Sequence, residues 1–320
     1  MRNRHPKLYA ILDVLLLMVL LPGAVPMKLF RRIGVHRLPL CKNALFRLGV
    51  FPLVNHYYEP QFDHRELAGG YAKDRSLPGI DWNVDGQLRM LGKFTHFGEL
   101  AELEGRRLEG IPPFSYQNSL FSYGDADYWY QIIRAVKPKR IFEIGSGNST
   151  IVARLALEMN REDDPDYACK HVCIEPFESP WLDGSGVTLI RKPVEHVGGE
   201  FFLELDEDDI LFIDSSHIIR PQGDVLFEYL ELLPSLKPGV IVHIHDIFSP
   251  KNYPEQWIAR DVRFWNEQYL LEAFLSHNAS WQVVGALNYL FHHHPNELGA
   301  VVPELSTERP PGSFYIRRKS

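Results

Sequence analysis

From Asp125 onwards, the hydrophobic positions of the chain follow two alternating patterns. Short apolar runs are bounded by glycine, proline and polar residues, and the longer segments between them carry apolar residues at the spacing of a helix face. The predicted strands are KRIFEIG, HVCIEPF, GVTLIRKP, DDILFIDSSH, GVIVHIHD, WQVVGALNYLFH and SFYIRR. The predicted helices are DADYWYQIIRAVKP, STIVARLALEMN, DVLFEYLELLPSL and RDVRFWNEQYLLEAFLSH.

Strands that alternate with helices predict an α/β fold, in which helices cover both faces of a mostly parallel sheet. The last two predicted strands have no full helix between them, so we expect an antiparallel pair at one edge. Residues 51–118 are rich in turns and aromatic residues and show weak periodicity. We therefore divide the chain into an N-terminal segment (residues 1–50), a cap region (51–118) and a main domain (119–320).

The N-terminal segment is apolar between residues 8 and 30 and otherwise basic. Residues 1–50 hold nine Lys and Arg against one acid, which gives this segment a net charge of +8. Because the whole chain has a net charge of −7, residues 51–320 have a net charge of −15. We expect Pro22, Gly23 and Pro26 to break the helix, and we favour a shallow or bent membrane-associated segment on the anionic cytoplasmic leaflet. A buried core helix, a true span and a signal peptide remain alternatives.

The rest of the composition narrows the setting and the partners. The three cysteines, Cys41, Cys169 and Cys173, are odd in number and have no zinc-type spacing, which favours a reducing, cytoplasmic compartment. The acidic body lacks the basic groove that nucleic-acid binding requires. His292, His293 and His294 are predicted to lie in a solvated loop. Aromatic-rich segments at 56–62 and 113–127 are predicted to form either a lid or ordinary packing.

The stretch IFEIGSGNST, residues 141–150, predicts a glycine turn between a strand and a helix. It lacks the Lys of a phosphate-binding P-loop. It also has Thr150 where a dinucleotide-binding turn carries its third glycine. What remains is Glu143-x-Gly145-x-Gly147, with a second acid, Glu175, at the end of the next strand. Carboxylates at these positions favour a ligand with a cationic end and ribose hydroxyls.

Polar residues also end two later strands, at Asp214-Ser-Ser-His217 and at His243-Ile-His245-Asp246. Both ends should meet at the carboxyl edge of the sheet, where open α/β folds bind ligands. Three interpretations stay open. A divalent metal could bind Asp214, Asp246 and His245. Alternatively, His217 or His245 could be a metal-free general base. These residues could also merely cap helices and bond one another.

Four of these motifs, IFEIGSGNST, CIEPF, DILFIDSSH and PGVIVHIHDI, occur in an order that resembles class I S-adenosylmethionine-dependent methyltransferases. The resemblance extends over roughly residues 119–318 and is greatest to the branch of macrocin-type O-methyltransferases and cephalosporin-hydroxylase-like proteins. It implies a Rossmann-like seven-stranded sheet with a C-terminal antiparallel hairpin. The cofactor-binding residues that it implies are Glu143, Gly145, Ser146, Gly147, Asn148, Glu175, Pro176 and Asp214, with Pro193–Glu195 beside the adenine.

The resemblance also implies a function. We expect S-adenosylmethionine-dependent O-methylation of a hydroxyl on a small molecule or glycoconjugate, with His217, His245 and Asp214 as catalytic residues. In the resembling branch an acidic pair binds magnesium, but here His245 replaces one carboxylate, which leaves room for manganese, iron or no metal. The alternatives are a metal-dependent oxidoreductase of cephalosporin-hydroxylase-like type, with its metal at Asp214, His217 and His245, and a catalytically silent, membrane-associated cofactor-binding module.

Overall fold

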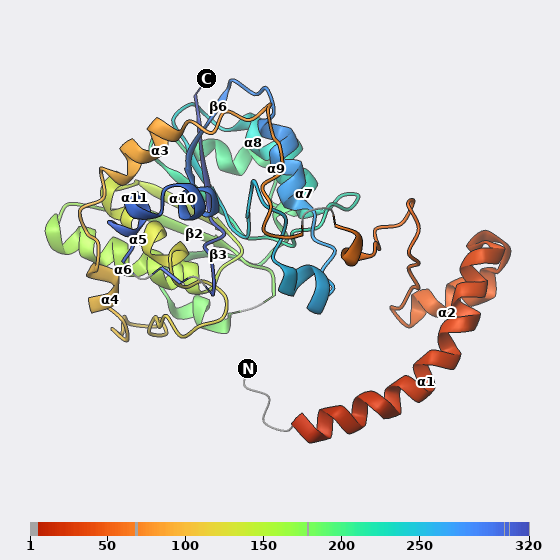
Figure 1. The fold of residues 1–320 in the computed structure, drawn as a ribbon. Coiled ribbons are helices and arrows are strands. Elements are labelled where there is room, and N and C mark those ends of the chain that lie inside the picture. The colour runs from red at the N-terminus through yellow and green to blue at the C-terminus, as the bar shows by residue number, and fades with distance from the viewer. Residues whose placement is uncertain (1–5, 68–69, 178, 304, 307, 320) are drawn as a thin grey trace. The chain divides into compact units, whose positions relative to one another are not determined.

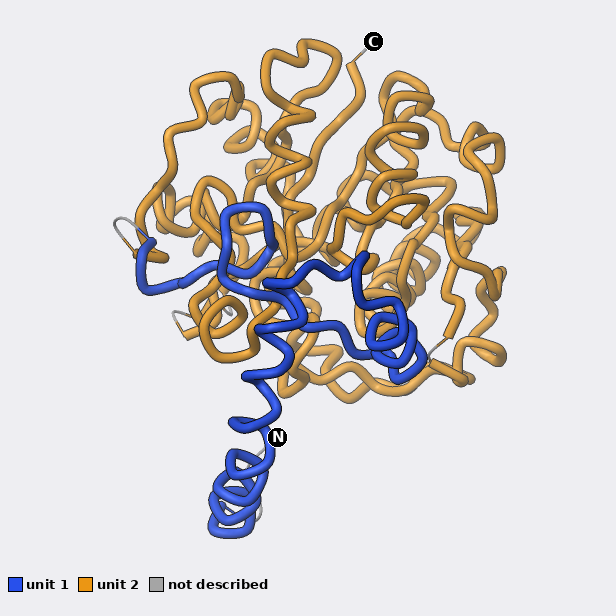
Figure 2. Tube along the Cα trace, turned by 90° about the vertical axis from the view of Figure 1, so that its right-hand side faces the viewer, with its two compact units in different colours: residues 1–68 blue, residues 69–320 orange. Residues whose placement is uncertain are grey.

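The computed structural model describes residues 6–67, 70–177, 179–303, 305–306 and 308–319. The chain divides into two compact units, residues 1–68 and 69–320 (Figure 2). This division falls between the domain boundaries that the sequence suggests at 50 and 118, and those boundaries stay a prediction. The two units are described separately.

The N-terminal unit is built on two helices, α1 (Pro6–Ile33) and α2 (Pro39–Arg47). Our prediction that the prolines break α1 differs from the structure, in which the helix continues through Pro22 and Pro26. A proline removes one backbone donor and need only bend a helix, and the apolar residues on both sides favour continuation. Its 28 residues extend about 42 Å, more than the ~30 Å hydrocarbon core of a bilayer. By length and composition, α1 is the one described helix that could cross a membrane.

The second unit is built on one seven-stranded sheet with the order β3-β2-β1-β4-β5-β7-β6 (Figure 1). The first five strands are parallel, and β7 lies antiparallel between β5 and β6. The strands are β1 (Arg140–Ile144), β2 (Lys170–Ile174), β3 (Thr188–Ile190), β4 (Ile210–Ile213), β5 (Ile241–Ile244), β6 (Trp281–Ala286) and β7 (Phe314–Arg318). The predicted Rossmann-like sheet with an antiparallel C-terminal pair is therefore confirmed.

Helices cover both faces of this sheet, as predicted. They are α3 (Val84–Leu91), α4 (Glu99–Glu102), α5 (Asp125–Val136), α6 (Asn148–Asp163), α7 (Asp224–Phe227), α8 (Leu233–Ser235), α9 (Glu267–Leu275), α10 (Leu287–His293) and α11 (Pro295–Gly299). Alternate strand residues supply two separate cores. Phe212 packs with Trp129 of α5 and Leu155 of α6, whereas Phe142 packs in the other core, with Leu271 of α9. Burial on both faces explains why the strands read as continuous apolar runs.

Three predicted elements differ from the structure. The run WQVVGALNYLFH is a strand only as far as Ala286 and then becomes α10, because Leu287 and Leu290 are three residues apart and bury one helical face. Helix α9 begins at Glu267, seven residues after the start of the predicted segment at Arg260. The histidine tract ends α10 instead of forming a loop, and His293 Nε2 lies 2.7 Å from Asp74 Oδ2.

Candidate active site

The glycine turn sits at the junction of three strand ends. Gly145 N donates to the carbonyl of Ile174 (3.0 Å), and Asp214 N donates to the carbonyl of Ile144 (2.8 Å). Gly145 has φ +80°, and a Cβ there would lie 2.1 Å from the carbonyl oxygen of Asp214. Only glycine accommodates both the backbone angle and the close approach. The turn and the end of β4 are therefore in direct contact.

Gly147 has a different environment, although it belongs to the same turn. Its φ of −178° is extended backbone, and a Cβ built on it would meet no protein atom within 4 Å. Helix α6 begins at the next residue, Asn148. The open side of the turn thus lies at Gly147, beside a helix N-terminus.

Glu143 lies beneath the turn and is completely buried. Its Oε2 accepts from Thr150 Oγ1 (2.6 Å) in the first turn of α6, and its Oε1 lies 2.8 Å from Nε2 of His171. Both carboxylate oxygens therefore have protein partners. Glu143 on β1 therefore links α6 and β2 through these two contacts. The direct contact with the cofactor that the resemblance implies for Glu143 stays a prediction.

Glu175 follows β2, and its carboxylate accepts from two backbone donors, Phe177 N (2.9 Å) and Ser146 N (3.3 Å). It thereby links the loop after β2 to the glycine turn. Phe177 is 85% exposed beside it. The predicted adenine segment, Pro193–Glu195, follows β3 and leads into a short 3₁₀ helix, Val194–His196. These predicted residues gather along the carboxyl edge of the sheet.

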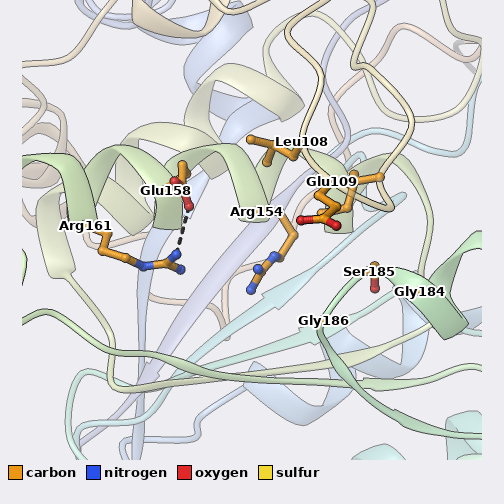
Figure 3. Close-up of a pocket in the computed structure, with 9 residues that line it drawn as sticks. Leu108, Glu109, Arg154, Glu158, Arg161, Gly184, Ser185 and Gly186 are labelled. Atoms are coloured by element: carbon orange, nitrogen blue, oxygen red, sulfur yellow. Dashed lines mark ion pairs between the residues drawn. The ribbon is translucent and has the colours of Figure 1, made fainter.

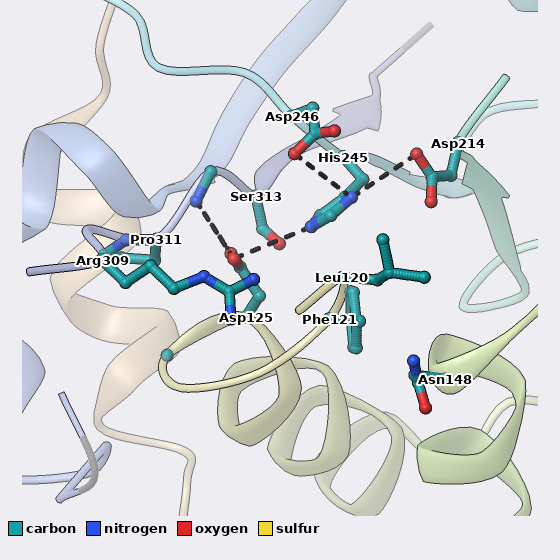
Figure 4. Close-up of polar contacts among 12 residues, drawn as sticks. Leu120, Phe121, Asp125, Asn148, Asp214, His245, Asp246, Arg309, Pro311 and Ser313 are labelled. Atoms are coloured by element: carbon teal, nitrogen blue, oxygen red, sulfur yellow. Dashed lines mark hydrogen bonds and ion pairs between the residues drawn. The ribbon is translucent and has the colours of Figure 1, made fainter. Parts of the chain in front are cut away.

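The ends of β4 and β5 bring together the second group of predicted residues, of which Figure 4 shows Asp214, His245 and Asp246. Nε2 of His217 lies 3.3 Å from Asp214 Oδ1 and 3.6 Å from Asp246 Oδ2. Nδ1 of His245 lies 3.5 Å from Asp214 Oδ1 and 3.6 Å from Asp246 Oδ1. We call these four residues the acid–histidine cluster. His217 and Asp246 both have φ +60°, an uncommon backbone region for these residues that often marks functional sites.

Burial and mutual charge set the protonation of this cluster. Burial alone would raise the pKa of Asp214, but His245 and His217 outweigh it and hold that pKa well below its ordinary value. Burial opposes charge on the two histidines, but the neighbouring carboxylates raise the pKa of both. Burial raises the pKa of Asp246 despite the two imidazoles. The cluster can therefore hold a proton on histidine beside an ionised Asp214.

Two further carboxylates contact the cluster, and the sequence did not indicate them as site residues. Asp125, which we had placed in the segment 113–127, accepts from Gly312 N (3.0 Å) and lies 3.7 Å from His245 Nε2 (Figure 4). Glu267, the first residue of α9, lies 2.7 Å from His217 Nδ1. Both come from elements distant in sequence, so no local spacing could reveal them.

His243 lies on the same face of β5 as His245, with the two ring centroids 6.3 Å apart, but its hydrogen bond is made outside the cluster. Its Nε2 lies 2.8 Å from Ser313 Oγ, and its ring stacks on Tyr315 with centroids 4.1 Å apart. Burial, together with the charge of His245, lowers its pKa well below the usual histidine value. His243 is therefore a neutral core residue. The rings of His243 and His245 both contact Phe121 and Phe212, as the alternation of side chains along a strand predicts for residues two positions apart.

A hollow of about 390 Å³ lies away from this edge, between α6, the turn at residues 108–111 and the loop before β3 (Figure 3). Arg154 and Arg161 line it, but so do Glu109 and Glu158, and Glu158 pairs with Arg161 at 3.0 Å. Two acids balance the two bases, so charge does not select a ligand there.

The chain is similar to known proteins in both sequence and structure. A family model described as a methyltransferase domain matches residues 142–247, from β1 to just beyond β5. An uncharacterized protein of Archaeoglobus fulgidus is 29% identical over 175 residues, which make up 50% of this chain and 76% of that protein.

Two solved structures are also similar. An O-methyltransferase from Bacillus cereus in complex with SAH is 11% identical, with a TM-score of 0.38, and the match covers 73% of this chain and 91% of that one. The mycinamycin-pathway methyltransferase MycE, in complex with Mg, SAH and mycinamycin VI, is 14% identical, with a TM-score of 0.34, over 60% of this chain and 48% of that one.

The domain match falls on the segment that carries the glycine turn, Glu175 and the acid–histidine cluster. The same unit contains the seven-stranded sheet with antiparallel β7. Residues 142–247 therefore form a methyltransferase domain, in agreement with the resemblance to class I S-adenosylmethionine-dependent methyltransferases.

Proposed function

We propose that this methyltransferase transfers its methyl group to a hydroxyl oxygen, and that His217 accepts the hydroxyl proton. One observation carries the proposal. The glycine turn contacts Asp214 through the close approach of Gly145, so a methyl donor on the turn would lie next to the acid–histidine cluster. Proximity of donor, acceptor and base can supply up to ~7–11 kcal/mol of the barrier.

The proposed cofactor site runs along the glycine turn and the loop after β2. The turn is open at Gly147, where no side chain opposes a ligand. Ser146, Asn148 and Asp214 surround the methionine part in this proposal, and Glu175 with Pro176 takes the ribose hydroxyls. Glu143 contributes by holding α6 in place, since its oxygens are already engaged.

The chemical step requires one bond exchange and one proton transfer. The acceptor oxygen attacks the methyl carbon, the carbon–sulfur bond breaks, and S-adenosylhomocysteine leaves while the hydroxyl proton passes to His217 Nε2. The sulfonium is already activated, so the protein chiefly aligns the reactants and accepts the proton. Because neighbouring carboxylates raise the pKa of His217, the metal-free reaction should accelerate as pH rises above the usual histidine range.

A divalent cation also fits the acid–histidine cluster. Donor atoms of Asp214, His217 and Asp246 lie within 4.8 Å of one another, and Nδ1 of His245 is buried without a hydrogen-bond partner among the described residues. Two carboxylates with imidazole suit manganese or iron better than magnesium. When bound, such an ion would polarise the acceptor hydroxyl.

The cofactor site is tested by calorimetric titration of S-adenosylhomocysteine into the full chain. We expect micromolar binding in the wild type. Glu175→Ala should weaken it by about 1–3 kcal/mol, roughly 5- to 150-fold, because ribose hydroxyls lose a charged acceptor. Gly147→Ala should also weaken binding while leaving the melting temperature nearly unchanged, since its methyl group meets no protein atom.

Gly145→Ala provides the matched control, because its added methyl group collides with the backbone of Asp214. It should lower the free energy of unfolding by about 1–3 kcal/mol or more. Failure of the folded wild type to bind would overturn the cofactor site, and unchanged affinity in both Glu175→Ala and Gly147→Ala would overturn its placement.

The cation is tested by titrating Mn²⁺ and Mg²⁺ into the protein saturated with S-adenosylhomocysteine. We expect Mn²⁺ to bind more tightly than Mg²⁺, and Asp214→Asn or Asp246→Asn to weaken Mn²⁺ binding at least tenfold. His243→Gln replaces a neighbouring buried histidine whose Nε2 bonds Ser313 and not the cluster, and it should leave Mn²⁺ binding unchanged. Absence of binding by either ion at millimolar concentration would reject the cation and leave the metal-free base.

We further propose that the protein is cytoplasmic and attached to the inner face of a membrane through α1, with a glycoconjugate or other small hydroxyl compound as acceptor. Among the described residues of α1, Phe30 is the one buried residue, and the apolar 18-residue window of this helix contains none. Basic residues at its end, Arg31 and Arg32, suit an anionic leaflet.

Membrane attachment predicts a specific extraction behaviour for the full chain. Detergent should release the protein from membranes, whereas salt at about 1 M should not, because salt screens charge interactions and does not weaken apolar insertion. Leu16→Lys with Leu20→Lys should shift the protein to the soluble fraction. Release of the wild type by salt alone would contradict apolar insertion.

A further inference from the structure

His217 is also held by Glu267, a carboxylate outside both the glycine turn and the acid–histidine cluster. Its Nδ1 lies 2.7 Å from Oε2 of Glu267, and the Glu267 side chain is completely buried. Nε2, on the opposite side of the ring, faces Asp214 and Asp246. The imidazole thus has one nitrogen in the protein interior and one toward the site.

The backbone around Glu267 is shaped to hold the same histidine. The amide groups of Asn266 and Glu267 both donate to the carbonyl of His217, at 3.0 and 3.2 Å. Asn266 Oδ1 also accepts from Ile219 N at 2.7 Å. These hydrogen bonds hold His217, whose backbone has a left-handed conformation, against the start of α9. A shift of His217 would break several of them together.

The remaining contacts of Glu267 fix the direction of the hydrogen bond. Its Oε1 accepts from the hydroxyl of Tyr229 at 3.0 Å. An ionised carboxylate has only acceptor oxygens, so His217 must donate from Nδ1. The neutral imidazole then carries its lone pair on Nε2, toward the site. The ring of Trp265, 4.2 Å from that of His217, restricts rotation of the imidazole.

Burial of a carboxylate costs free energy that ordinary helix packing does not require. Among the described contacts of Glu267, its charge is used by His217 and Tyr229 alone. We infer that Glu267 is a positioning residue, which keeps the proton of His217 on Nδ1 and presents Nε2 to the acceptor hydroxyl. This inference deepens the proposed function and rests on its assignment of His217 as the base.

The inference is tested by nitrogen-15 spectra of the histidine rings in the full-length protein saturated with S-adenosylhomocysteine. His217→Asn identifies the signals of His217. In the wild type we expect Nδ1 to keep a hydrogen-bonded, slowly exchanging proton whether or not Nε2 is protonated. In Glu267→Gln that downfield proton should be lost, and the tautomer protonated on Nε2 should become populated.

Two variants serve as controls. Glu228→Gln alters another completely buried carboxylate, which accepts from Ser215 Oγ at 3.0 Å and makes no hydrogen bond to the His217 ring among the described residues; it should preserve the Nδ1 proton of His217. Tyr229→Phe removes the second donor to Glu267 and should preserve the Nδ1 proton. A general loss of order in the protein would alter His217 in all three variants alike.

An unprotonated Nδ1 in the wild type overturns the inference, and this result does not depend on whether any variant folds. Persistence of the same Nδ1 proton in folded Glu267→Gln overturns it as well. Binding of S-adenosylhomocysteine is measured on the same samples. Failure to bind would reject the proposed methyl-donor site, whereas normal binding with an altered tautomer in Glu267→Gln would support the positioning role alone.

Discussion

The candidate active site depends on the contact between the glycine turn and the end of β4. At Gly145 the backbone approaches the carbonyl of Asp214 so closely that no side chain fits between them. This contact joins two sites whose residues lie about 70 positions apart in the sequence. Donor and acceptor chemistry can be adjacent because parallel strands place their carboxyl ends at one edge. The buried bonds of Glu143 beneath the turn reinforce the junction from below.

The class of fold could be predicted from the sequence because each strand is buried on both faces. Runs such as IFEI and ILFI have no polar face, and helices separate them, which leaves few arrangements other than a covered parallel sheet. The glycine turn was also recognisable, because its glycines and nearby acids are local in sequence. Prediction failed where local pattern and tertiary packing compete. Leu287 and Leu290 continue an apolar run but pack as a helix, and α1 tolerates two prolines.

The candidate site was predicted only in part, for a related reason. Asp214, His217, His245 and Asp246 could be grouped because strand order implies their proximity, and the structure brings them together. Glu267 and Asp125 contact the same histidines from a helix N-terminus and from the start of α5. Nothing in the spacing of these acids distinguishes them from helix-capping residues. Glu143 was expected to contact the cofactor, and the sequence could not show that both of its oxygens have buried protein partners.

The central claim is that one junction holds both the methyl donor and the proton acceptor. It is tested most directly by a crystal structure of the protein with S-adenosylhomocysteine bound. The account predicts the ligand along residues 145–148 with its ribose on Glu175, and its sulfur facing the space beside Asp214 and Nε2 of His217. A ligand bound elsewhere, such as in the hollow at Arg154, or a sulfur directed away from the acid–histidine cluster, would contradict it.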